Sequence, residues 1–402
     1  MLRLTLLLNL LGLLSAPAFA LVVEPGSLRA DGLSDYLGLP NPTPRLSWRL
    51  TSTTRGDSQT AYQIQAASDP SKLESPDLWD TGEVVSATQN VVYSGSTLSS
   101  RSTVYWRVRA WDANGTASNW SEDAYVEMAL LSGSDWTASW IANTGYVTGE
   151  NSLPVFAKEF SVDCPITTGR LYLLGLGQHD ATLNGYSVTD EVLAPGYSTI
   201  AKTMLYSSYN ITSLLGSGSN VLGIELGKGE YDPEPGLGGR YMRYTTSPVQ
   251  LKLISQLEWT CQNGSRFSMV SDGSWQTTLE GPRIESSWYG GEEYDARKDL
   301  GNYTAPNGNR SGWSTVTIST SPGGQMTNPA TPPLKIVDEI TAVSVTQVKT
   351  SKDSSRIFNN VHTGRIFISL RSRSQHCWLV RDHNDRLPRP ACCLDSWRKP
   401  EH

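Results

Sequence analysis

The sequence predicts an all-β protein built from tandem β-sandwiches. Short runs that alternate apolar and polar residues recur along residues 21–303, and Ala61–Ala66 has the period of a half-buried strand. Gly, Asn and Asp punctuate these runs at intervals typical of turns. No long window sustains the i, i+3, i+4 apolar spacing of an amphipathic helix; the best short candidate is Ile211–Leu215. A chain of 402 residues is long enough for two or three such domains.

The first 20 residues are predicted to be a secretory signal peptide. Arg3 precedes an apolar run of leucines, and Ala18-Phe19-Ala20 supplies the small residues of a cleavage site. A buried N-terminal helix is the alternative. No other segment approaches the roughly 18 apolar residues of a membrane span, so we expect a secreted, extracellular protein with no membrane partner.

Residues 21–132 are expected to form the first sandwich. Its clearest strand is Thr103–Asp112, in which Trp106, Val108 and Ala110 share one face. We expect that face to point into the core. Regular short strands over about 100 residues are similar to a fibronectin type III or immunoglobulin-like domain.

Residues 135–303 are expected to form a second sandwich of the jelly-roll type. The predicted strands are Val155–Val162, Gly169–Leu176, Asp180–Leu183, Asn220–Leu226, Val249–Trp259 and Arg266–Ser271. Residues 304–331 are then predicted to be a linker, and residues 332–358 the truncated beginning of a further β-domain.

Residues 359–402 are predicted to be an aberrant basic tail. Four of the five His and three of the five Cys fall within the last 52 residues. Such a shift is typical of translation out of frame or through an unspliced intron, and a genuine basic extension is the alternative.

Charge and cysteine content limit the possible partners and cofactors. Residues 21–350 carry 22 Lys and Arg against 34 Asp and Glu, and this acidic body has no attraction for nucleic acid. No Cys-x-x-Cys spacing suggests a metal site. Cys164 and Cys261 could pair in an oxidising compartment, but the sequence cannot show that they meet.

Asn-x-Ser/Thr sequons are expected to lie in surface loops and to carry glycans, as in a secreted glycoprotein. They begin at Asn114, Asn119, Asn210, Asn263, Asn302 and Asn309.

Two motifs carry a resemblance to a known family. The segments Leu183–Tyr197 and Ser287–Asp299, with the entry Asp135–Ile141, resemble the N-terminal, non-catalytic β-domains of secreted, fungal-type α-L-rhamnosidases. Intact members of this glycoside hydrolase family act on terminal α-L-rhamnosyl groups of plant glycosides and pectic polysaccharides. The resemblance therefore implies rhamnose-containing glycosides as partners.

The resemblance also implies where catalysis belongs. These enzymes place their general acid and base on an (α/α)6 barrel that follows the β-domains. Because the 402 residues contain no series of amphipathic helices, no catalytic residue can be assigned and we expect this chain to be inactive. A stand-alone, calcium-dependent L-rhamnose-binding module is the alternative function.

The candidate sugar site contains Asp190, Glu191 and Tyr231. The two acids follow the turn at Asn184-Gly185, a position that in relatives belongs to a module binding L-rhamnose through calcium. Calcium prefers carboxylate and carbonyl oxygens, so both acids are candidate metal ligands. Tyr231 is the candidate aromatic for stacking on the sugar, and a solvated acidic turn without ligand is the alternative. No cofactor for catalysis is expected.

The remaining polar motifs are interpreted as structural. Glu292 and Glu293 are neighbours and should point to opposite faces of a strand, and Asp295 is expected to pair with Arg297. His179 lies on a turn and is expected to be a satisfied structural histidine.

Overall fold

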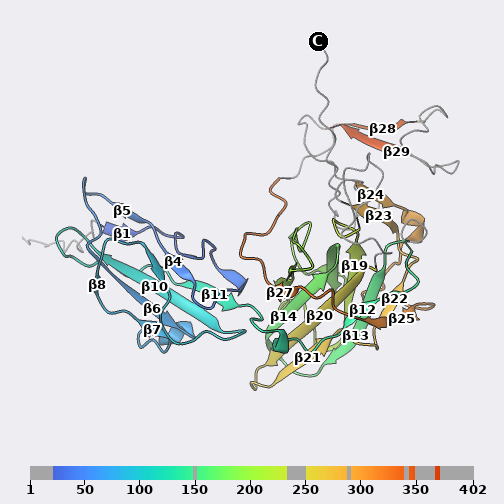
Figure 1. Ribbon diagram of the computed structural model, residues 1–402, viewed down its shortest axis with the longest axis horizontal. Coiled ribbons are helices and arrows are strands. Elements are labelled where there is room, and N and C mark those ends of the chain that lie inside the picture. The colour runs from blue at the N-terminus through green and yellow to red at the C-terminus, as the bar shows by residue number, and fades with distance from the viewer. Residues whose placement is uncertain are drawn as a thin grey trace, which may run out of the picture. The chain divides into compact units, whose positions relative to one another are not determined.

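The computed structural model describes residues 21–147, 152–232, 250–287, 291–338, 344–348 and 367–371. The chain divides into two compact units between Leu131 and Ser132. The described residues form strands, turns and three short 3-10 turns, with no α-helix among them, which confirms the all-β prediction (Figure 1). No helix in this described part is long and apolar enough to cross a membrane. The predicted signal peptide and most of the predicted tail fall outside it.

The first unit contains a central sheet and two smaller ones. The central sheet runs in the order β3 (Tyr36–Leu39), β11 (Ala124–Met128), β10 (Thr103–Trp111), β6 (Ala61–Ala67) and β7 (Trp79–Asp80), and β8 (Val84–Val85) also pairs with β6. The smaller sheets are β1 (Leu21–Val23) with β5 (Leu50–Ser52), and β2 (Arg29–Ala30) with β4 (Arg45–Ser47) and β9 (Asn90–Val92). All pairs except β3 with β11 are antiparallel. Each sheet can therefore turn one face to a shared core.

The alternation in β10 produces the core of this unit. Trp106, Val108 and Ala110 are fully buried, as the pattern predicted. Trp106 packs in a cluster that includes Leu46 on β4 and Ile64 on β6, so it joins the two layers. Removing the indole would leave a large cavity at the centre of the unit.

The outward face of β6 is also buried, so the prediction of a half-buried strand was wrong. Arg109 Nε donates to Gln63 Oε1 at 3.0 Å, and Arg107 Nε donates to Gln65 Oε1 at 3.0 Å. The Trp120 ring lies 4.7 Å from the Arg109 guanidinium and 4.6 Å from that of Arg107. The two arginines thus bind both glutamines, and Trp120 packs on the arginines through cation–π contacts. The sequence period could not show this, because the covering side chains come from distant segments.

We predict that Trp106→Ala lowers the free energy of unfolding by about 3–5 kcal/mol, because it removes a buried aromatic side chain. Urea unfolding of the whole chain followed by circular dichroism measures the change. Val85→Ala is the matched control, since Val85 is 85% exposed and should cost under about 0.5 kcal/mol. Equal losses for the two variants would contradict the assignment of Trp106 to the core.

The second unit is built mainly from two large sheets. One runs β18 (Ser207–Asn210), β14 (Ile166–Gly175), β20 (Lys252–Cys261), β12 (Trp140–Ala142) and β26 (Thr317–Ser319), with β21 (Arg266–Val270) paired to β20. The other runs β16 (Tyr186–Ser187), β15 (Gln178–Leu183), β19 (Gly218–Gly227), β13 (Val155–Val162), β22 (Gln276–Thr278) and β25 (Ser314–Thr315). Short pairs join β17 (Thr203–Leu205) with β27 (Gln325–Thr327) and β23 (Arg283–Ser287) with β24 (Gly291–Tyr294). The long antiparallel strands make a sandwich with its core between the sheets (Figure 1).

The longest pairing in this unit joins β14 to β20 and ends at a disulfide. The register runs from Ile166 opposite Cys261 to Gly175 opposite Leu253. Cys164 and Cys261, which the sequence could not show to meet, form a disulfide with their Cα atoms 5.8 Å apart. The bond links two segments 97 residues apart and so constrains the unfolded chain.

Residues 304–331, expected to be a linker, contribute three strands to the second unit. β25 pairs with β22, β26 with β12, and β27 with β17. β25 and β26 lie at the ends of their sheets, where polar strands are tolerated because one face and one edge meet water. Their polar composition therefore resembled that of a linker.

Residues 332–358, predicted to begin a further β-domain, follow β27 in the chain. Lys335 forms an isolated β-bridge with Glu191. β28 (Ser344–Val348) pairs with β29 (Phe367–Arg371), and β29 falls within the predicted tail.

Candidate functional site

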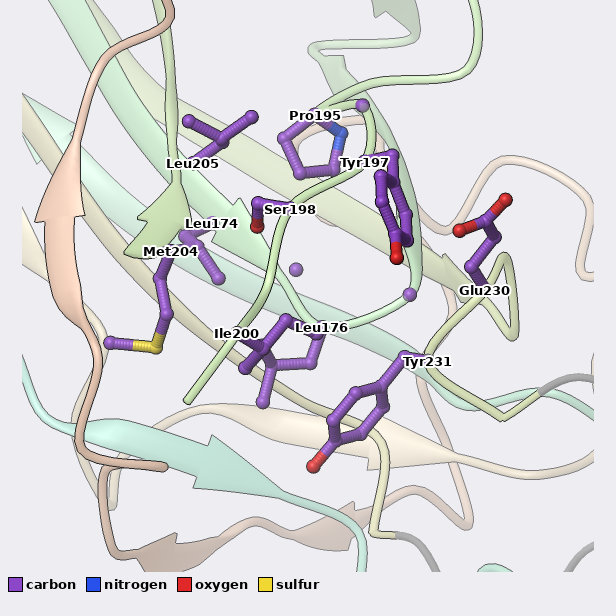
Figure 2. A pocket seen from close by; sticks show the side chains of 13 residues that line it. Leu174, Leu176, Pro195, Tyr197, Ser198, Ile200, Met204, Leu205, Glu230 and Tyr231 are labelled. Atoms are coloured by element: carbon purple, nitrogen blue, oxygen red, sulfur yellow. The ribbon is translucent and has the colours of Figure 1, made fainter. Parts of the chain in front are cut away.

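A pocket opens at one end of the second unit. Its enclosed volume is only about 30 Å³, and it is open to solvent. It is lined by Leu174, Gly175, Leu176, Gly177, Pro195, Gly196, Tyr197, Ser198, Ile200, Met204, Leu205, Glu230 and Tyr231. Figure 2 shows Leu174, Leu205 and Met204 on one side, with Tyr197, Tyr231 and Glu230 on the other. Apolar walls with a few polar groups are typical of a small-molecule site.

Two glycine turns bring the walls of this pocket together. Gly177 has a φ of +98°, and a Cβ there would lie 2.1 Å from the carbonyl oxygen of Gly227. Only glycine tolerates both the backbone conformation and the contact. The turn that begins at Gly227 continues to Tyr231, whose backbone N–H donates to the carbonyl of Lys228 at 3.0 Å. Tyr231 is thereby held beside Gly177.

The loop Pro195–Ser198 supplies another part of the rim. It follows a cis peptide bond between Ala194 and Pro195, and the Ala194 carbonyl accepts a hydrogen bond from the His179 backbone N–H at 3.1 Å. Tyr197 is 58% exposed, so its ring is accessible to a ligand. Burial raises the pKa of the Tyr231 hydroxyl, which therefore stays a neutral hydrogen-bonding group at ordinary pH.

The predicted sugar-site residues do not come together in this pocket. Tyr231 lines it, but Asp190 and Glu191 do not. Asp190 is exposed and pairs with Lys335, whose Nζ lies 2.9 Å from Asp190 Oδ1. The acids follow β16 on a separate turn, so the grouping of all three residues into one sugar site stays a prediction.

The donor set at this turn does not fit calcium. Among the described residues no group of three His, Cys, Asp or Glu side chains is placed to hold a metal. Burial raises the pKa of Glu191, the Lys335 ammonium opposes that shift, and the Asp190 carboxylate adds to it. Calcium takes six to eight oxygen ligands, whereas here an ammonium group already lies against one of the two carboxylates.

Several pocket residues carried a signal that sequence reasoning left unused. Tyr197 lies in Ala194-Pro-Gly-Tyr197, an exposed aromatic after a proline turn, which could have identified it. Glu230, next to the predicted Tyr231, also lines the pocket. Leu174 and Met204 look like ordinary strand residues, and nothing in the sequence shows that they border a pocket.

The acids of the second motif are structural, as expected. Arg297 binds Asp295 through two hydrogen bonds of 2.8 and 2.6 Å. Arg283 forms an ion pair with Glu292 across the β23–β24 hairpin. Paired carboxylates of this kind stabilise local structure and are not poised for acid–base chemistry.

His179 is buried beside the pocket. Its Nδ1 accepts a hydrogen bond from the Gly175 backbone N–H at 3.3 Å, which leaves Nε2 to donate to the Tyr209 hydroxyl at 2.9 Å. Burial lowers the pKa of His179 to about 3. A proton on Nδ1 would face the Gly175 N–H, so the neutral tautomer is the one that fits. The structural interpretation of His179 agrees with this geometry.

We predict that His179 makes the protein less stable in acid. The unfolded histidine binds a proton below pH about 6.5, whereas the folded one does not until pH about 3. Stability is therefore fully present above pH 6.5 and falls by up to about 1.4 kcal/mol per pH unit between these values. Denaturant unfolding at several pH values measures the slope, and His179→Gln, which keeps a donor toward Tyr209, should flatten it. An unchanged slope in the variant would show that His179 is not responsible.

Both units match known protein families. Residues 25–132 match the family described as "Rha78A-like, N-terminal immunoglobulin domain". Residues 165–338 match "Alpha-L-rhamnosidase N-terminal domain".

Individual relatives agree with these matches. The chain is 35% identical to an α-L-rhamnosidase of Formosa agariphila, over 71% of this chain and 32% of the relative. It is 34% identical to one of Alteromonas sp., over 82% of this chain and 37% of the relative. The solved α-L-rhamnosidase of Aspergillus terreus gives a TM-score of 0.72 at 30% identity, covering 81% of this chain and 37% of that one. The chain thus spans about a third of the length of these relatives, and residues 25–132 and 165–338 are N-terminal domains of the α-L-rhamnosidase family.

Proposed function

We propose that these β-domains are accessory domains of an α-L-rhamnosidase, and that the pocket of the second unit binds an L-rhamnosyl group without hydrolysing it. The observation that carries the proposal is the pocket itself, which Tyr197, Tyr231 and Glu230 line on one side and Leu174, Met204 and Leu205 on the other. Aromatic rings pack against the C–H face of a sugar, and a carboxylate accepts hydrogen bonds from its hydroxyls. The family matches supply the sugar, because the relatives are named as α-L-rhamnosidases.

The composition of the pocket argues against hydrolysis at this site. Glycoside hydrolysis generally needs two carboxyl groups on either side of the scissile bond. Glu230 is the single carboxylate among the residues that line this pocket. A glycoside bound here would contact one carboxylate, Glu230, whereas hydrolysis requires two.

A second depression, in the first unit, is acidic but lacks a sugar platform. Its lining includes Glu24, Asp35, Glu122 and Asp123, with no aromatic residue. Glu24 pairs with Arg49 at 3.1 Å, and Asp35 accepts a hydrogen bond from the Tyr125 backbone N–H at 3.1 Å. Two of its acids therefore have structural partners, and the depression does not suggest a glycoside site.

We predict that the purified 402-residue chain does not turn over nitrophenyl α-L-rhamnoside above a buffer blank. The reason is the missing second carboxylate at the pocket. Release of nitrophenol is followed by absorbance, with an active α-L-rhamnosidase as the positive control. Turnover that co-purifies with the chain and is lost in Glu230→Gln would contradict the proposal.

Binding is the second part of the proposal and is tested separately. We predict that L-rhamnose binding, measured by isothermal titration calorimetry, weakens roughly tenfold or more in Tyr231→Ala and Tyr197→Ala. Tyr186→Ala is the matched control, because Tyr186 is an exposed tyrosine outside the pocket. L-Mannose, which carries a hydroxyl on the methyl carbon of L-rhamnose, should bind more weakly against the floor of Leu174 and Met204. No heat with L-rhamnose, or equal loss in the Tyr186 variant, would remove the binding function.

The wider context of the protein remains a set of predictions. All six sequon asparagines are exposed, which supports glycosylation and a secreted, extracellular protein. A fungal-type origin, and action of the intact enzyme on pectic polysaccharide, rest on the sequence resemblance.

A further inference from the structure

The chain after β27 forms backbone contacts with the turn that carries Asp190 and Glu191. Lys335 and Glu191 form a β-bridge, and the Val192 backbone N–H donates to the Leu334 carbonyl at 2.9 Å. This bridge fixes the path of the chain at Leu334 and Lys335. The lysine side chain therefore starts from a defined position beside the two acids.

The lysine ammonium lies against these acids. Lys335 Nζ is 2.9 Å from Asp190 Oδ1, and its charge also acts on the Glu191 carboxylate. Asp190 and Glu191 are adjacent in sequence and would repel each other without a nearby positive charge. A single ammonium thus compensates both.

We propose that the ammonium group of Lys335 occupies the position that a divalent cation would otherwise take beside Asp190 and Glu191, so that this turn is held together without calcium. The inference concerns the turn and goes beyond the sugar-binding function, because neither acid lines the pocket. Calcium binds carboxylate oxygens at about 2.3–2.6 Å, and at Asp190 Oδ1 it would have to share that oxygen with the ammonium. Charge repulsion and the lack of a third acidic ligand among the described residues both oppose this arrangement.

The test is calcium binding to the full chain and to charge variants. We expect no heat on titrating calcium into the wild-type chain, and no change in its melting temperature between calcium and a chelator. Lys335→Met keeps most of the aliphatic stem and removes the charge, so it should gain calcium binding at least tenfold above the wild type. A second change, Asp190→Asn, should remove the gain. Lys335→Arg should behave as the wild type does.

A matched control removes the same charge elsewhere. Lys72 pairs with Asp77 at 2.7 Å on the surface of the first unit, and Lys72→Met should gain no calcium binding. Calcium binding by the wild type that is lost in Asp190→Asn would overturn the proposal, as would a folded Lys335→Met chain that gains none. If Lys335→Met does not fold, the wild-type titration decides alone. L-Rhamnose titrated in chelator is a separate readout, so failure of the sugar site is distinguishable from failure here.

Discussion

The close contact of two glycine turns is the constraint on which the second unit's pocket depends. The register of β15 on β19 sets Gln178 opposite Gly227, and the Gly177 turn then lies directly on the carbonyl of Gly227. No side chain fits between the two backbones. The turn after β19 must therefore stay beside β15, and this brings Tyr231 to the pocket that β14 and the Pro195–Ser198 loop border on their side.

The same turn carries charge into the protein interior. The Lys228 side chain is 1% exposed and forms an ion pair with Glu285 on β23. The buried Glu225 carboxylate accepts a hydrogen bond of 3.2 Å from the Tyr303 hydroxyl and lies near Arg283. Buried charges are tolerated only when they are paired in this way. Glu285 and Glu292 on the β23–β24 hairpin are thus both held in ion pairs.

In the proposed function, sugar recognition and charge compensation fall to different groups in this unit. The pocket combines aromatic and apolar surface with one carboxylate. On a separate turn, the Lys335 ammonium pairs with Asp190 and acts electrostatically on Glu191. Burial raises the pKa of the Tyr231 hydroxyl in the pocket, which therefore remains a neutral hydrogen-bonding group. The resemblance predicts one site from Asp190, Glu191 and Tyr231, and in the structure only Tyr231 lines this pocket.

The sequence alone determined what depends on neighbours along the chain. Alternation placed Trp106 in the core because successive side chains in a strand point to opposite faces, and Asp295 pairs with Arg297 across two positions. Tertiary structure alone decided which distant segments meet. Gln63 is buried because Arg109 covers it from another strand, and the pocket exists because four separate segments converge. Such contacts follow from strand register and turn geometry over long sequence separations, which no local pattern encodes.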